Sequence, residues 1–204
     1  MATRKATSNY REKTEGAETP RRLTRDLLRA FELAVMIAHS RASETIEVSD
    51  VLAGLYMDNW ERLSRFWKDT DEVEKTLRQL CHISPQRWNY WIEYYAGMRE
   101  SKEKTWLDIG AQPFRRWRGN KNKTPAGRDI ELSSELEGVL KEADEIAAFQ
   151  DRVGLRTVPI VSSESVLLAI VQSAPTSIGR KLLSTGLDVV ALEKAARFPR
   201  HAPI

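Results

Sequence analysis

Residue types that carry acid–base or nucleophilic chemistry near neutral pH are scarce in this chain. It holds a single cysteine, Cys81, and three histidines, His39, His82 and His201, among 204 residues. Structural zinc sites use four sulfur or nitrogen ligands, so this set is too small, and we interpret the adjacency of Cys81 and His82 as coincidental. A single cysteine also excludes an internal disulfide. We therefore expect neither a metal nor another cofactor.

The chain also lacks the short motifs that position phosphates, hydrides or activated serines. The nearest approach to a phosphate-binding loop, Gly119 to Thr124, has no second glycine before its lysine, so its backbone amides are poorly placed to cradle a phosphate. No Gly-x-Ser-x-Gly, His-Glu-x-x-His or dinucleotide-binding motif occurs. Neighbouring carboxylates such as Glu142 and Glu145 lie in helical stretches and are typical of a solvated face. We expect a protein that is not an enzyme.

A basic, aromatic stretch offers binding rather than catalysis. Between residues 114 and 128 there is no acidic residue, and Phe114 and Trp117 lie among the cations. Arginine and lysine neutralise phosphates while aromatic rings stack on bases, so the stretch is compatible with nucleic acid. It is also compatible with a solvated loop whose tryptophans anchor it to the helical core, and we prefer this second interpretation. The candidate nucleic-acid contacts are Arg115, Arg116, Arg118, Lys121 and Lys123.

The composition predicts one folded region with loose ends. Hydrophobic residues make up 41% of the chain and charged residues 30%, with a mild net charge of +3. Residues 1–21 contain almost no apolar side chains, so we expect a flexible tail there, and a second tail at 199–204. No apolar run approaches the roughly 18 residues of a membrane span, and none follows the first residues as in a secretory leader. We expect a cytoplasmic protein whose fold occupies residues 22–198.

Apolar side chains at helical spacing predict four short helices in residues 22–81. The first begins near Leu23 and is amphipathic, with charged residues opposite its apolar stripe. Ser49 is predicted to cap the second helix and Asp58 the third, because short polar side chains accept hydrogen bonds from free N–H groups at helix starts. The residues that define the four helices are Leu27, Phe31, Ala34 and Val35, then Val51, Leu52 and Leu55, then Trp60 to Trp67, then Val73, Leu77 and Leu80.

The same order of elements recurs in residues 132–198. Leu132-Ser133-Ser134 opens a helix, and Ser162 to Ser165 precedes the apolar run Val166 to Ile170, which matches Val51 to Leu55. Gly186 can end the next helix in a left-handed conformation, and Asp188 can cap the last one. Residues 82–131 separate the two groups and hold four of the six tryptophans. This stretch is too long for an ordinary connection, so we interpret it as an insertion.

These segments resemble the double Clp repeat, the substrate- and adaptor-receiving domain at the N-terminus of Clp chaperone ATPases. Leu23-Thr24-Arg25 looks like the opening of one repeat, and Val48 to Leu55 looks like the segment that follows it. Leu132-Ser133-Ser134 and Ser162 to Leu168 look like the second copy, and Ser177 to Asp188 is similar to the family's third helix and its following turn. The signal lies in the order and duplication of the segments.

The resemblance implies an all-α fold, a pseudo-two-fold bundle of two four-helix Clp repeats at 22–81 and 132–198. We expect the long Trp-rich insertion, residues 82–131, to pack across this bundle. We also expect a stand-alone double repeat without an ATPase of its own.

The resemblance also implies where a partner binds. The family carries an acidic residue ahead of the short helix, which in some members contacts phosphoarginine on marked substrates. Glu164 matches it in the second repeat, whereas Ser49 takes its place in the first, with Asp50 one position along. A hydroxyl followed by an acid also caps a helix, so capping is a second interpretation. The predicted partner-binding residues are Ser49, Asp50, Ser163 and Glu164 in a groove between the repeats, and Trp91 and Trp117 on the insertion.

Together these observations predict a non-catalytic protein- or peptide-binding module. In terms of the family, it is expected to be an adaptor, a substrate-recognition domain or a regulatory partner in Clp-type unfolding and proteolysis, with a Clp unfoldase or its substrates as partners. The alternative is a nucleic-acid-binding protein that uses residues 114–128. The first reading predicts binding that depends on a shaped groove, and the second predicts binding that weakens steeply with salt.

Overall fold

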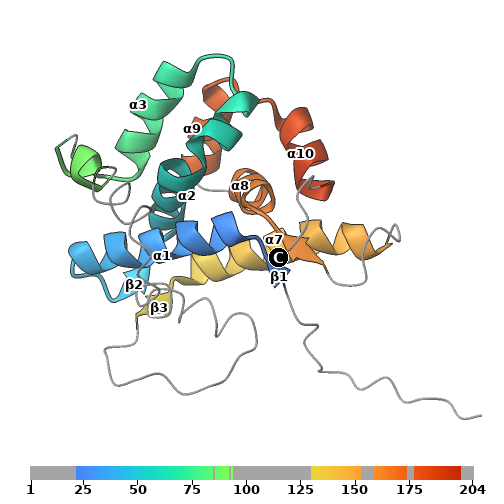
Figure 1. The fold of residues 1–204 in the computed structure, drawn as a ribbon, viewed down its shortest axis with the longest axis horizontal. Helices are drawn as coiled ribbons and strands as arrows, with labels where there is room; N and C mark the ends of the chain where they lie inside the picture. The colour runs from blue at the N-terminus through green and yellow to red at the C-terminus, as the bar shows by residue number, and fades with distance from the viewer. Residues whose placement is uncertain are drawn as a thin grey trace, which may run out of the picture.

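The protein is a bundle of α-helices with very short strands, which confirms the predicted all-α class. The computed structural model describes residues 22–84, 86–91, 93, 130–152, 159–173 and 177–198. The predicted tails, 1–21 and 199–204, and most of the 82–131 insertion lie outside these residues. Figure 1 shows the described elements around α8, which lies at the centre of the bundle.

The elements follow one another in two similar series. The first series is β1 (Arg22–Leu23), α1 (Arg25–Ser40), β2 (Thr45–Ile46), α2 (Val48–Leu63), the 3-10 turn η1 (Ser64–Phe66) and α3 (Thr70–Leu80). The second is β3 (Glu131–Leu132), α7 (Ser134–Arg152), β4 (Ile160–Val161), α8 (Ser163–Gln172), α9 (Ser177–Ser184) and α10 (Val189–Arg197). Each series therefore runs strand, helix, strand, helix before its last helices.

The strands pair across the two series rather than within them. β1 lies parallel to β4, with Leu23 opposite Val161, and β2 lies parallel to β3, with Ile46 opposite Leu132. The first strand of each series thus pairs with the second strand of the other. This exchange is the pattern expected of two halves related by an approximate two-fold axis, and it gives the sequence repetition a structural counterpart.

Polar side chains begin most of the helices, and the cap at Asp188 confirms a prediction from the sequence. Thr24 accepts a hydrogen bond from the Leu27 amide at 3.3 Å, and Ser133 does the same for Leu136 at 3.3 Å. Ser162, Asp69 and Asp188 cap α8, α3 and α10 in the same way. Gly186 has a φ of +77° in the turn after α9, the left-handed conformation that glycine adopts without strain.

One predicted helix start is wrong. Ser49 does not cap the second helix, because β2 pairs through Ile46 and the helix begins directly afterwards, which puts Glu47 at the N-cap and Ser49 inside the first turn. The predicted third helix, Trp60 to Trp67, corresponds to the part of α2 after Asn59 together with η1. A φ of −120° and a ψ of 15° at Asn59 kink α2 there. The buried Asn59 amide donates to the Asp26 carbonyl at 3.4 Å and so holds the kink against α1.

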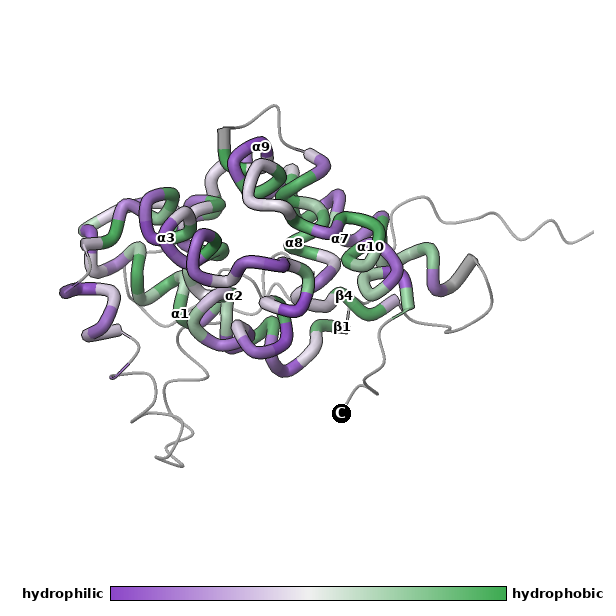
Figure 2. Tube along the Cα trace, turned by 90° about the horizontal axis from the view of Figure 1, so that it is seen from above, coloured by the Kyte–Doolittle hydropathy of each residue, from purple (hydrophilic) through white to green (hydrophobic). Residues whose placement is uncertain are grey.

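One hydrophobic core joins both halves. It contains side chains from every described α-helix, and α8 is buried along its whole length except for Gln172. Hydrophobic and hydrophilic stretches alternate along the outer helices in Figure 2, as expected when each turns one face to the core and the other to water. Burying a large aliphatic side chain contributes about 1.5–3 kcal/mol, so α8, which contacts α2 of the first half and α7, α9 and α10 of the second, stabilises the packing of the whole bundle.

The start of the insertion packs on this core. Residues 86–91 are helical, and Trp88 is completely buried with its ring 4.8 Å from that of Tyr56. Tyr56 also lies 4.6 Å from the Trp60 ring, and Trp60 lies 6.2 Å from Trp67. A row of aromatic rings therefore runs from the insertion along α2 to the end of η1.

The crossing of α1 and α2 predicts opposite outcomes for two glycines. A Cβ on Gly54 would lie 2.1 Å from the Ala30 carbonyl oxygen, so Gly54→Ala must push the helices apart and should lower the free energy of unfolding by about 2 kcal/mol or more. Gly138, exposed on α7, has nothing within 4 Å of its added Cβ, so Gly138→Ala should raise stability by about 0.5–1 kcal/mol. Urea unfolding of both variants tests this. Equal effects would contradict the tight crossing.

Candidate functional site

The crossed strand pairing brings two helix N-termini together. β1 leads into α1 and β4 leads into α8, and the Thr24 amide, at the cap of α1, donates to the Val161 carbonyl at 3.1 Å. Each helix start has an acidic residue in its first turn, Asp26 in α1 and Glu164 in α8. Free N–H groups and the helix dipole make a helix start favourable for a carboxylate. Two carboxylates from different halves of the molecule therefore converge here.

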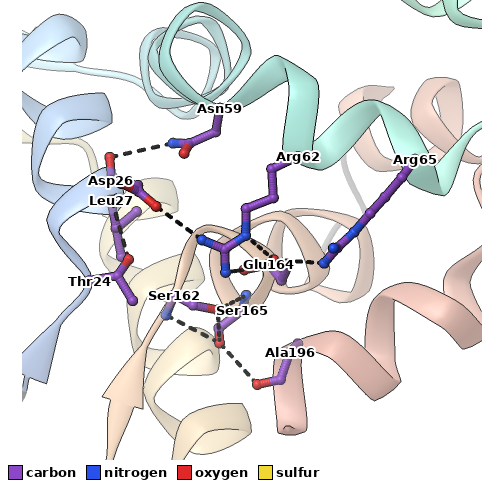
Figure 3. Close-up of polar contacts among 10 residues, drawn as sticks. All are labelled: Thr24, Asp26, Leu27, Asn59, Arg62, Arg65, Ser162, Glu164, Ser165 and Ala196. Atoms are coloured by element: carbon purple, nitrogen blue, oxygen red, sulfur yellow. Dashed lines mark hydrogen bonds and ion pairs between the residues drawn. The ribbon is translucent and has the colours of Figure 1, made fainter. Parts of the chain in front are cut away.

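Arg62 lies between these two carboxylates (Figure 3). Its guanidinium donates from Nε to one Glu164 oxygen at 2.6 Å and from Nη2 to the other at 2.7 Å, and Nη1 reaches Asp26 at 3.0 Å. Glu164 is 1% exposed and the Arg62 side chain is 15% exposed. Bidentate bonding of this kind is strong and directional, so Arg62 is fixed by both helix starts at once.

A second arginine completes the cluster from the outside. Arg65, one turn further along the chain, donates to Glu164 at 3.2 Å while its side chain stays 48% exposed. The cluster thus contains two guanidinium groups and two carboxylates, and its net charge is zero. Its polar atoms are used by the chain itself, which suits a structural joint better than a reacting centre.

A serine network lies beneath the Glu164 carboxylate. Ser162 and Ser165 bond reciprocally, with the Ser165 amide donating to the Ser162 hydroxyl at 3.3 Å, and the Ser165 hydroxyl donates to the Ala196 carbonyl at 3.5 Å. These bonds tie the start of α8 to the end of α10. The Ser163 hydroxyl is completely buried, and no hydrogen-bond partner for it lies among the described residues. The start of α8 is therefore a rigid part of the core.

The approximate two-fold relation gives a second pair of neighbouring helix starts, those of α2 and α7, and we call each such pair a joint. The joint at α2 and α7 has different contacts from the joint at α1 and α8. Asp50, 2% exposed, accepts two bonds from Arg41 Nη2, at 2.7 and 2.6 Å, and one from the Glu47 amide at 2.9 Å. Burial raises the pKa of Asp50 above its ordinary value of 3.8, although the Glu47 amide and Arg41 both act to lower it. Ser49, only partly buried, lies in register with Glu164. The acid at this joint is thus one position later and faces an arginine of its own half.

The predicted site residues are therefore dispersed. Asp50 and Glu164 lie in separate clusters, each bound by arginines of the chain, and Ser163 is buried. Trp91 is also buried, whereas its neighbour Tyr90 is 57% exposed. Trp117 and the predicted nucleic-acid contacts Arg115, Arg116, Arg118, Lys121 and Lys123 lie outside the described residues.

The sequence reasoning missed the arginines that hold these carboxylates. Arg62 and Arg65 lie one helical turn apart, on a stretch with the bulky residues Trp60, Leu63 and Phe66. That spacing gives a cationic edge beside an apolar one, which signals a partly buried basic face. The acid they bind is 102 residues away for Arg62 and 99 for Arg65, and no local pattern connects them.

The single cysteine has the properties of a core residue. Cys81 is buried, and burial raises the pKa of its thiol, so the nucleophilic thiolate is disfavoured. The adjacent His82 is exposed. In the part of the chain that the structure describes, no group of three or more His, Cys, Asp and Glu residues is placed to hold a metal ion. None of its helices is long and apolar enough to span a membrane.

Comparisons with known proteins give a distant structural likeness. No family model matches the chain, and no curated protein sequence matches it. Among solved structures, it is similar to the N-terminal domain of the caseinolytic protease associated chaperone ClpD from Arabidopsis thaliana. The identity is 14%, the match covers 86% of this chain and 92% of that one, and the TM-score is 0.44. A likeness this distant does not extend to side chains, whose roles rest on the contacts described above.

Loss of the Glu164 charge should lower the stability of the fold strongly. Glu164→Gln leaves Arg62 without its buried counter-charge, so the free energy of unfolding should fall by about 3 kcal/mol or more. Glu193→Gln is the matched control, because it breaks the Arg197–Glu193 pair, in which both side chains are 38% exposed, and should cost at most about 0.5 kcal/mol. Urea unfolding measures both. Similar losses in the two variants would show that Arg62 and Glu164 do not form a buried pair.

Asp50 should make stability depend on pH. Between 3.8 and its raised folded pKa, the folded protein holds the Asp50 proton while the unfolded chain has lost it, so the contribution of this group falls as pH rises through that window and is constant above it. Relative to Asp50→Asn, the native protein should thus gain stability as pH is lowered. Denaturant unfolding at several pH values measures the difference, and NMR of the Asp50 carboxyl carbon gives the midpoint. A midpoint at or below the ordinary value contradicts the expectation.

Proposed function

We propose that this protein is a non-catalytic module that binds a protein or peptide partner, as an adaptor, substrate-recognition or regulatory domain in Clp-type unfolding and proteolysis. The observation that carries the proposal is the duplicated series of elements whose strands pair across the halves. This arrangement agrees with the double Clp repeat that residues 23–55 and 132–188 resemble in sequence. The partners proposed are a Clp unfoldase or its substrates.

The chemistry of the described residues supports binding. The charged groups at the joint between the halves are engaged in ion pairs, and the described cysteine is held as a buried thiol. Large apolar side chains are exposed on the last helices instead, with Leu183 on α9, Val190 on α10 and Phe198 directly after it. Exposed apolar groups beside arginine and lysine supply much of the energy at protein interfaces. Exposed side chains of this kind can contact a partner without any rearrangement of the core.

Binding at Glu164 itself requires a change in the protein. A guanidinium from a partner can reach this carboxylate only if Arg62 or Arg65 leaves it, because both of its oxygens already accept hydrogen bonds. Arg65 is the easier group to displace, since it makes one longer contact and is about half exposed. The groove version of the proposal thus includes competition between the partner and the protein's own arginines.

The second candidate function is nucleic-acid binding through residues 114–128. Its support is the run of cations with Phe114 and Trp117 among them, a composition suited to phosphates and stacked bases. The described residues contain 22 acidic and 16 basic side chains, a net charge of −6, whereas the whole chain is at +3. Basic segments such as residues 114–128 would therefore have to supply the attraction for phosphates.

Salt dependence separates the two functions. The tagged protein, incubated with lysate at about 50 mM and about 200 mM salt, should retain the same unfoldase, protease or client at both, because a shaped protein interface responds modestly to screening. A nucleic acid held by about six phosphate contacts would lose about a thousandfold or more in affinity over that range. Mass spectrometry and nuclease treatment identify what is retained.

A variant with Arg115, Arg116 and Arg118 changed to Gln is the matched control. It should retain the protein partner, whose binding must then be reproduced with the two purified components. Recovery of nucleic acid alone, lost both at high salt and in this variant, would overturn the protein-binding proposal in favour of the second function.

A further inference from the structure

The end of α2 and the turn after it form a segment, residues 60–67, that joins the two halves. It begins after the non-helical Asn59 and ends where the chain becomes extended at Trp67. Arg62 and Arg65 bind Glu164, and the Phe66 carbonyl accepts from the Asp188 amide at 2.8 Å. The segment belongs by sequence to the first half, but most of its polar contacts are with the second.

A further bond closes the end of the segment. The Trp67 indole N–H donates to the Thr185 hydroxyl at 2.9 Å, in the turn between α9 and α10. The turns that precede α3 and α10 therefore touch each other, as an approximate two-fold relation requires. All of these contacts are hydrogen bonds or ion pairs, and the Arg65 side chain is about half exposed, whereas the Arg62–Glu164 pair is buried.

Beneath this segment lies a small apolar cavity. Trp60, Leu63 and Trp67 form one wall, and Leu77 of α3 and Leu167 of α8 contribute to the others. No polar atom lines it, and its volume, about 10 Å³ for the centre of a water-sized sphere, is that of a single water molecule. An apolar space of this kind stays dry, so the walls forgo contacts that a partner's side chain could supply.

We propose that residues 60–67 act as a latch: release of Arg62 and Arg65 from Glu164 lets the segment pivot at Asn59 and opens the cavity to an apolar side chain of a protein partner. The pivot is placed at Asn59 because the backbone there already departs from helical dihedral angles and kinks α2. The ion pairs of Glu164 with Arg62 and Arg65 then keep the apolar cavity closed, and their release opens it.

The chemistry of the cavity defines the occupant. Its walls are leucine and aromatic side chains, which favour a leucine or phenylalanine anchor on the partner. Segment 60–68 carries Arg62, Arg65 and Lys68 against one acid, Glu61, so acidic residues beside that anchor would pair with the arginines that have left Glu164. This part of the inference rests on the proposed protein-binding function, whereas the latch itself does not.

Hydrogen exchange tests the latch in the intact chain. The release variant is Arg62→Lys with Arg65→Gln, which keeps one positive charge beside Glu164 but cannot bond bidentately. Amides of 60–67 should exchange faster in this variant by a factor at least about tenfold larger than those of α8, because a local opening exposes only its own segment. Glu193→Gln, which breaks a surface pair on α10, should leave both regions as they are. Exchange of 60–67 only together with α8, in every variant, overturns the latch.

Benzene, as a mimic of a phenylalanine side chain, tests the cavity. In the release variant, benzene should shift the methyl NMR signals of Leu77 and Leu167, which line the cavity, and leave those of Leu140 in α7 in place. The unaltered protein should bind it at least about tenfold more weakly, because its closed cavity is too small. Opening without any benzene-induced shift at the lining methyls overturns the cavity as a binding site. The proposed function is then judged separately, by recovery of its partner.

Discussion

The crossed pairing of four two-residue strands is the constraint from which the rest of this structure follows. Because β1 lies beside β4 and β2 beside β3, the helix that follows each strand starts next to a helix of the other half. Two pairs of helix N-termini are thereby forced together. Adjacent N-termini bring like partial charges close, which is unfavourable unless negative groups compensate. The acids in the first turns of α1, α2, α7 and α8 supply that compensation, so their presence follows from the topology.

The arginines at the helix starts offset the cost of burying these acidic side chains. A carboxylate such as Glu164 is attracted by the helix start but loses nearly all of its water there, and a buried charge is costly without a partner. Arg62 offsets that cost with two parallel hydrogen bonds to the carboxylate. At the other joint Arg41 serves Asp50 in the same sense, yet burial still raises the pKa of that carboxyl. The first joint connects the halves, whereas the second ties α2 to the end of α1.

Local patterns in the sequence predicted much of the fold, whereas contacts between residues far apart in the sequence could not be predicted from them. The stripe of α1 and the cap at Asp188 depend on neighbours within four residues, so periodicity and capping rules found them. Strands of two residues are too short to show an alternating pattern, and without β2 the start of α2 was placed at Ser49 instead of directly after Glu47. The partners of Glu164 were hidden for a similar reason. Arg62 comes close to Glu164 only in the folded chain. The kink at Asn59, just before this arginine, is itself held by a contact with the distant Asp26.

The two joints differ because the equivalent positions hold different side chains. Asp69 and Asp188 cap equivalent helices, which places Lys181 where the first half has Arg62, and the register of α2 with α8 places Ser49 where the second has Glu164. Lysine is a point charge without a planar fork, and serine has no charge, so these residues cannot form a bidentate pair. One joint is therefore closed by ions across the halves and the other is not. A duplicated scaffold can thus acquire one switchable end through two substitutions, without any change in the path of its chain.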